Sequence, residues 1–136
     1  MKLSEAMKER TLLSFELFPP KTEKGMENLP GTIDHLMKYK PSYISCTYGA
    51  GGGNVGANRE VCQMIKKAGT TPVTHFTVIR NTKEGIKEQL DQYLAEGVDH
   101  MLALRGDIPL GETTTCGDFN YATDLVKFVR DSYGDK

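Results

Sequence analysis

The sequence has little that would point to a membrane or to nucleic acid. No apolar run approaches the roughly 18–20 residues of a membrane span, and residues 1–10 (MKLSEAMKER) lack the apolar centre of a signal peptide. Lys plus Arg is 17 and Asp plus Glu is 18, so the formal net charge is −1. Without a basic excess, neither nucleic acid nor an anionic membrane is favoured as a partner. We expect a soluble, cytoplasmic chain.

Cysteine is also scarce. Cys46, Cys62 and Cys116 form no CxxC pair, so the sequence has no zinc or thiol-exchange motif of that kind. An odd number of cysteines without a secretory signal indicates free thiols in a reducing compartment. Neither His35 nor His100 shows a spacing with carboxylates or cysteines that indicates a metal site. We therefore expect no bound metal.

The 136 residues allow a single domain, at about 150 residues per domain. With 38% apolar and 26% charged residues, the composition is that of a globular protein. Apolar runs alternate four times with amphipathic stretches. The predicted strands are residues 12–17, 43–47, 71–78 and 100–104; the predicted helices are a segment containing Ile33, Leu36 and Met37, then residues 58–67, 82–96 and 122–133. Pro30 is expected near the first turn of its helix.

This alternation predicts an α/β fold with a parallel sheet built from four βα units. Two architectures are open: a four-stranded doubly wound sheet, and the first four units of a (βα)8 TIM barrel, whose full length is typically about 250 residues. Polar residues gather at the strand ends: Glu16, Thr47, Tyr48, His75, Arg105, Gly106 and Asp107. The turn after the first strand has no glycine before Gly25. Both features favour the barrel, with adjacent strands in the order 1-2-3-4.

Two of these polar residues lie within apolar strands. Glu16 is flanked by Phe15 and Leu17, so we expect it to be buried. Burial raises the pKa of a carboxyl group, and a general acid at neutral pH requires such a rise. An ion-paired core carboxylate is the structural alternative. A lone strand histidine such as His75 is more often a core residue than a ligand.

Three further segments have open interpretations. The glycine-rich residues 49–56 match neither a P-loop nor GxGxxG, and a mobile loop is the preferred interpretation. Arg105-Gly106-Asp107 resembles an adhesion tripeptide, but at a strand end it makes better sense as a ligand clamp. Tyr121-Ala122 opens the last predicted helix, where backbone N–H groups are available to an anion.

Five segments, in order along nearly the whole chain, resemble the methylenetetrahydrofolate reductase family. They are SFELFPPKT, YISCTYGAGG, THFTVI, MLALRGDIP and YATDLV. The resemblance implies a flavoprotein (βα)8 barrel. Such an enzyme uses NADH or NADPH to reduce FAD and passes the hydride to 5,10-methylenetetrahydrofolate, giving 5-methyltetrahydrofolate.

The resemblance also implies roles for individual residues. Glu16 corresponds to the general acid that helps to open the methylene bridge of the folate. Asp107 corresponds to a carboxylate beside the flavin that assists folate binding and stabilises positive charge on the substrate. The positions that would line the FAD site are Thr47, Tyr48, Ala50, His75, Leu104, Arg105, Gly106, Asp107, Tyr121 and Ala122.

The family's barrel needs about eight βα units, and this sequence contains four. Residues 1–136 would then be the N-terminal half of a flavin-binding barrel domain. We expect either that they are a fragment of a longer chain, or that a second copy or another subunit supplies the missing half. The alternative to an enzyme is a non-catalytic half-barrel that serves as an assembly module. In either case we expect two open sheet edges and an uncovered apolar face, with Leu13, Phe15, Met101 and Ala103 on the edge strands.

Overall fold

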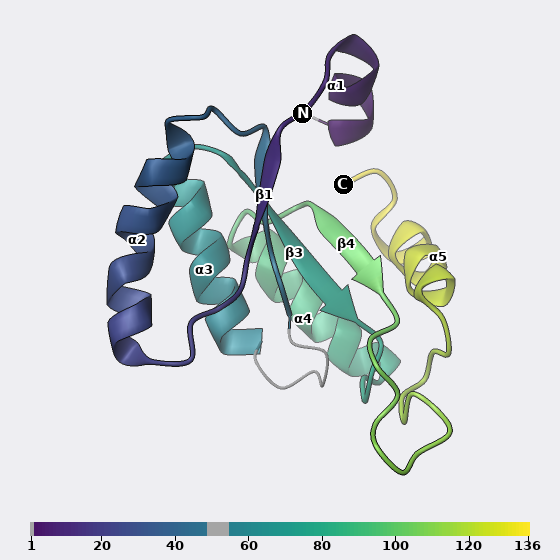
Figure 1. Cartoon of the computed structure of the whole chain (residues 1–136). Coiled ribbons are helices and arrows are strands. Elements are labelled where there is room, and N and C mark those ends of the chain that lie inside the picture. Colours follow the sequence, from purple (N-terminus) through teal and green to yellow (C-terminus); the bar gives the residue numbers. More distant parts are fainter. Residues whose placement is uncertain (1, 49–54) are drawn as a thin grey trace.

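The computed structural model describes residues 2–48 and 55–136, which contain a four-stranded parallel sheet (Figure 1). Its order is β1-β2-β3-β4, and each neighbouring pair is parallel. The expected order is confirmed. The strands are slightly shorter than predicted: β1 (Ser14–Leu17), β2 (Tyr43–Cys46), β3 (Thr71–Thr77) and β4 (Met101–Leu104).

Each strand is followed by a helix, as the alternation predicts. Two of these helices begin at a threonine that caps them: the Thr22 hydroxyl accepts from the Gly25 N–H, and Thr82 does the same for Gly85. A short helix before the first strand was not predicted, because residues 1–10 carry too many charges to show an apolar face. The helices are α1 (Leu3–Glu9), α2 (Glu23–Met37), α3 (Val55–Ala68), α4 (Lys83–Ala95) and α5 (Ala122–Tyr133).

Pro30 lies in the middle of α2 and not near its first turn, so that expectation is wrong. The helix begins at Glu23, about two turns before Pro30, because the Thr22 cap fixes its start. Proline lacks an N–H, which removes one hydrogen bond to the preceding turn. Pro30 is exposed, while Leu29 and Ile33 on the same helix are buried against the sheet. Packing of the apolar face therefore outweighs the lost bond.

The helices α2 to α5 pack on one face of the sheet (Figure 1). Ile44 and Cys46 of β2 and Phe76 of β3 point to that side and are fully buried. They pack in one apolar cluster with helical residues that include Val61, Ile65, Ile86, Tyr93 and Leu125. A doubly wound sheet has helices on both faces. Helices on a single face, with consecutive strands adjacent, are the arrangement of a partial barrel.

Asn58 of α3 is the polar centre of this core, and no part of it is exposed. Its Nδ2 donates to the carbonyl oxygens of Cys46 and Thr47, at 3.0 and 2.9 Å. Its Oδ1 accepts from the Thr74 hydroxyl at 2.8 Å and the Tyr93 hydroxyl at 2.5 Å. A buried amide with all its partners satisfied fixes geometry. Asn58 thus joins the end of β2 to β3 and α4.

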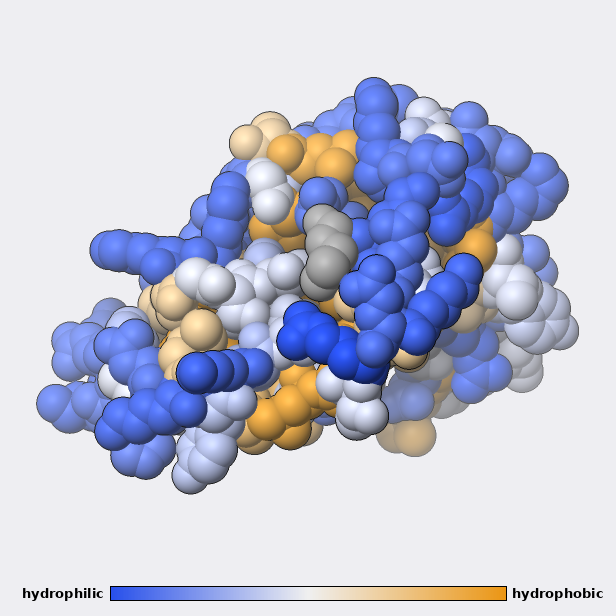
Figure 2. Space-filling model, turned by 90° about the horizontal axis from the view of Figure 1, so that it is seen from above, coloured by the Kyte–Doolittle hydropathy of each residue, from blue (hydrophilic) through white to orange (hydrophobic). Residues whose placement is uncertain are grey.

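Among the described residues, no helix has the length and apolarity needed to cross a membrane. Seen from the end at which α1 lies, the surface is mainly hydrophilic, and apolar atoms show in separate patches between polar residues (Figure 2).

We expect Asn58→Ala to lower the free energy of unfolding by roughly 2–4 kcal/mol, because it leaves several buried groups without partners. Urea denaturation measures this loss. Lys67→Ala on the exposed side of the same helix is the control and should change stability by less than about 0.5 kcal/mol. Equal effects of the two substitutions would contradict the role given to Asn58.

Candidate functional site

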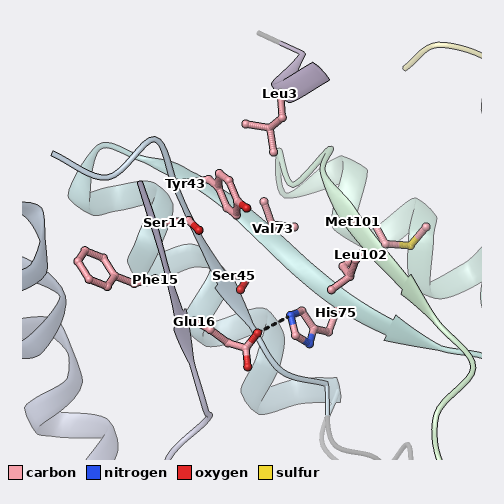
Figure 3. A pocket seen from close by; sticks show the side chains of 10 residues that line it. All are labelled: Leu3, Ser14, Phe15, Glu16, Tyr43, Ser45, Val73, His75, Met101 and Leu102. Atoms are coloured by element: carbon pink, nitrogen blue, oxygen red, sulfur yellow. Dashed lines mark ion pairs between the residues drawn. The ribbon is translucent and has the colours of Figure 1, made fainter. Parts of the chain in front are cut away.

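The face of the sheet opposite the helices is largely polar. Side chains alternate along a strand, so residues two apart share a face. In the strand register Glu16 lies beside Ser45, and Ser45 lies beside Val73. Figure 3 shows these side chains on one side of the sheet, with Phe15 pointing away from them. The cavity they line has a volume of about 380 Å³ and is bordered by Leu3, Ser14, Phe15, Glu16, Tyr43, Ser45, Val73, His75, Met101 and Leu102.

This arrangement corrects the expected apolar face. Phe15, Met101 and Ala103 pack against the helix-side core. The open face instead carries hydroxyl, carboxyl and imidazole groups, with Leu102 as an exposed apolar residue. Because β1 and β4 are separated by two strands yet border one cavity, the polar face is concave.

Glu16 and His75 face each other across this cavity. The Glu16 Oε2 lies 3.3 Å from the His75 Nε2 (Figure 3), an ion pair when the imidazole is protonated. The contact does not have hydrogen-bond alignment, and the buried Nε2 has no hydrogen-bond partner among the described residues. The Glu16 side chain is 50% exposed. The expected burial of Glu16 is therefore wrong, because its side chain points to the face of the sheet opposite helices α2 to α5.

A second cavity, of about 470 Å³, lies at the carboxyl ends of the strands. Its lining combines residues from β1 to β4 that lie far apart in the sequence: Phe18, Thr47, Tyr48, His75, Thr77, Leu104, Arg105, Gly106 and Asp107. His75 borders both cavities, so they adjoin. The Thr77 hydroxyl is buried here without a hydrogen-bond partner among the described residues. Two side chains that border this cavity, His75 and Thr77, thus each have a buried polar atom without a hydrogen-bond partner among the described residues, which is typical of a ligand site.

The segment after β4 supplies one wall of this cavity. Arg105 and Asp107 are exposed, so a guanidinium and a carboxylate reach solvent at its mouth. Gly106 has φ +82°, and a Cβ there would lie 2.5 Å from the Ile79 side chain. Glycine is therefore required at this position by packing against Thr77 and Ile79, at and just after the end of β3.

Tyr48 points to the other side of the sheet. Its ring is 1% exposed and lies 5.0 Å from the ring of Phe76 in the helix-side core. Its hydroxyl donates to Gln89 Oε1 at 2.5 Å. Burial raises the pKa of this hydroxyl. Only the backbone of Tyr48 is therefore left to meet a ligand in the cavity.

Of the predicted site residues that the structure describes, Tyr121 and Ala122 border neither cavity. Ala50 lies outside the described residues. Tyr121 and Ala122 begin α5, and the Tyr121 N–H donates to the Asp124 carboxylate at 3.0 Å. That carboxylate already occupies the position at which an anion was expected. The Tyr121 ring itself is exposed.

Sequence reasoning missed two residues of the second cavity. Thr77 lies two positions after His75, so the period of the strand already placed it on the same face. Phe18 gave no such signal, because it follows the end of β1 in a turn, where the alternation no longer applies.

Within residues 2–48 and 55–136, no group of three or more His, Cys, Asp or Glu side chains is placed to hold a metal ion.

The fold defines the class of this protein as an α/β barrel-type domain. Helices α2 to α5 follow the strands of a parallel sheet and pack on one face of it, and polar residues line a cavity at the carboxyl ends of the strands. Comparison with known proteins gives the family. Residues 2–136 match the family model described as methylenetetrahydrofolate reductase. The chain belongs to this family, as the five sequence segments predicted.

Curated relatives from plants and bacteria support the assignment. The chain is 36% identical to a probable methylenetetrahydrofolate reductase (NADH) of Oryza sativa subsp. japonica, over 98% of this chain and 23% of that protein. It is 38% identical to methylenetetrahydrofolate reductase (NADH) 1 of Zea mays, over 93% and 22%. It is 36% identical to 5,10-methylenetetrahydrofolate reductase of Pectobacterium carotovorum subsp. carotovorum, over 90% and 40%. The chain thus spans less than half the length of these relatives.

The three cysteines differ in their reactivity. Cys46 and Cys62 are buried, whereas Cys116 is exposed. Burial raises the pKa of Cys62 to about 12 and raises that of Cys46 further, so both thiols stay protonated near neutral pH. At about pH 8 we expect one thiol per chain, Cys116, to react with iodoacetamide, because only an accessible thiolate is nucleophilic. Mass spectrometry of the folded chain measures this. Labelling of Cys46 before unfolding would contradict the packing of β2 against α3.

Proposed function

We propose that this chain is the N-terminal half of a flavin-binding barrel that catalyses the reduction of 5,10-methylenetetrahydrofolate to 5-methyltetrahydrofolate, in the cytoplasm. The observation that supports it best is the cavity at the strand ends. It brings together Thr47, His75, Leu104 and the Arg105–Asp107 segment, and two side chains of its lining, His75 and Thr77, each have a buried polar atom without a hydrogen-bond partner among the described residues.

The described residues fit an FAD cofactor. The Thr77 hydroxyl and the His75 imidazole offer buried hydrogen-bonding groups for the polar edge of a flavin. The exposed guanidinium of Arg105 offers donors to phosphate oxygens. When bound, FAD would supply the redox chemistry, taking a hydride from NADH or NADPH and delivering it to the folate.

The two carboxyl groups would act on the folate. Glu16 in its protonated form would give its proton to the amine nitrogen released when the methylene bridge opens. Its half-exposed position on the open face of β1 leaves the carboxyl accessible to a substrate. Asp107 lies at the mouth of the second cavity, where its carboxylate would stabilise the positive charge that develops on the folate.

The half-barrel also needs a partner. Within the described residues, the outer edges of β1 and β4 pair with no further strand. A groove of about 740 Å³ runs beside β4, and its apolar lining includes Leu3, Met101, Leu102, Val126 and Val129. We propose that a second copy of the chain, another subunit or a further part of the same polypeptide covers these edges.

A measurement of flavin binding distinguishes the two proposed functions, the enzyme and the non-catalytic assembly module. We expect the chain to bind FAD weakly and saturably, measured by the change in flavin fluorescence on titration. Thr77→Val keeps the shape but removes the hydroxyl, and it should raise the Kd about fivefold to tenfold. Thr77→Ser should retain binding, and Thr11→Val on the exposed segment before β1 is the control. No saturable binding by the unaltered chain would favour the assembly module.

The role of Glu16 is tested in the complete barrel. Glu16→Gln should slow the oxidation of reduced flavin by methylenetetrahydrofolate about 10²–10⁴-fold, because the proton donor is lost. Flavin reduction by NADH or NADPH should change little. Anaerobic stopped-flow absorbance measures the two half-reactions separately, with Glu60→Gln on the exposed face of α3 as the control. If both half-reactions slowed equally, Glu16 would instead be a binding or folding residue.

The open edges predict the behaviour of the isolated chain. Unpaired backbone N–H and C=O groups along β1 and β4 are sites of association between strands. We expect dimers, higher oligomers or aggregates, measured by multi-angle light scattering. A stable monomer that unfolds cooperatively would show that the edges are covered in another way and would contradict the half-barrel assignment.

A further inference from the structure

One side chain outside the cavity lining connects several of its walls. Asn81 lies in the turn between β3 and α4 and is half-buried. Its Nδ2 donates to the carbonyl oxygen of Thr77 at 2.9 Å. Its Oδ1 accepts from Gln89 Nε2 at 3.1 Å, and Gln89 Oε1 accepts from the Tyr48 hydroxyl. A continuous series of hydrogen bonds therefore runs from the end of β2, through α4, to the end of β3.

The same turn also forms hydrogen bonds with the long segment between β4 and α5. The Arg80 N–H donates to the Thr115 carbonyl at 2.8 Å, and the Asp118 N–H donates to the Asn81 carbonyl at 3.0 Å. The Asp118 carboxylate in turn accepts from the Lys83 N–H at 2.7 Å. The segment that begins with the cavity residues Arg105 to Asp107 is thus anchored to the β3–α4 turn at its far end.

Close packing reinforces this anchor at both ends of the segment. A Cβ on Gly117 would lie 2.6 Å from the Asn81 carbonyl oxygen and 2.8 Å from that of Val78. A Cβ on Gly106 would meet Ile79 and Thr77 of the same turn and strand. Only glycines allow the segment to approach this closely.

The turn is held in a conformation that needs support. Arg80 has φ +54°, in the left-handed region that non-glycine residues adopt at a cost. The Asn81 side chain closes the turn by bonding back to Thr77, and the Arg80 N–H is held by Thr115. The local conformation and the docked segment therefore depend on each other.

We propose that Asn81 is a positioning residue that holds the β3–α4 turn in the conformation on which the β4–α5 segment docks. Through that turn it sets the position of Arg105 and Asp107 relative to Thr77 and His75. Asn81 does not border the cavity itself. It acts through the backbone of its neighbours. The effect on ligand binding rests on the proposed flavin site, whereas the effect on the turn does not.

Amide hydrogen exchange of the full chain, without any ligand, tests the structural half of this inference. Asn81→Ala should accelerate exchange at the Asp118 and Arg80 amides about tenfold, because a tenfold change corresponds to the loss of about one hydrogen bond. Exchange at Ile44 in the sheet should stay unchanged. Asn120→Ala, an exposed asparagine of the same segment, is the control and should alter neither.

Gly117→Ala provides a second route to the same test if Asn81→Ala unfolds the chain. It pushes the segment off the turn while leaving the Asn81 side chain intact, so the same two amides should exchange faster. Unchanged exchange at Asp118 and Arg80, or an equal rise at Ile44, would overturn the proposed coupling.

FAD titration tests the positioning role. Asn81→Ala and Gly117→Ala should each raise the Kd for FAD about tenfold relative to Asn120→Ala, since both release the segment that carries Arg105. Faster exchange with an unchanged Kd would overturn the positioning role. If the unaltered chain bound no FAD, the proposed flavin site would fail, and the exchange experiment alone would decide whether Asn81 anchors the segment.

Discussion

The alternation of side chains along β2 and β3 is the constraint on which the rest of this structure depends. Ile44, Cys46 and Phe76 pack against residues of α2 to α5 and are fully buried, while Ser45, His75 and Thr77 face the other way. Apolar side chains on one face stabilise the helix layer by their removal from water. The opposite face is thereby left to polar residues, and its concave form gathers them from β1 to β4 into two adjoining cavities.

Hydrogen bonds from amide side chains hold the backbone at the strand ends in fixed positions. Asn58 is buried and fully paired, and it holds the carbonyl oxygens at the end of β2 against β3 and α4. Gln89 joins Tyr48 to the turn after β3. Hydrogen bonds of this kind are directional, whereas apolar contacts are not. The apolar core brings the strands together, and the amides define where each strand ends.

Several features of the site were predictable from residues close together in the sequence. Strand ends are marked by Pro19, by the glycines after Tyr48 and by Gly106, so the alternation of βα units and the gathering of polar residues at one edge followed directly. The orientation of Thr77 followed from His75 by the period of a strand. The same rule places the side chain of Tyr48 with Ile44 and Cys46 on the helix side, although Tyr48 follows Thr47 at the strand end and borders the second cavity.

Other features depend on what covers a residue, and the local sequence does not contain that. The neighbours of Glu16 are apolar, yet its side chain is half exposed, because it points to the face of the sheet opposite helices α2 to α5. Asn58, Asn81 and Gln89 look like ordinary polar residues of helices and turns, and their bonds join positions 4 to 41 residues apart. Strand order, family and the set of strand-end residues were thus determined by the sequence, through periodicity and short motifs. Only the tertiary structure decided three features: the exposure of Glu16, which side chains lie on each face at the strand ends, and the anchoring of the β4–α5 segment. They depend on contacts between segments that folding alone brings together.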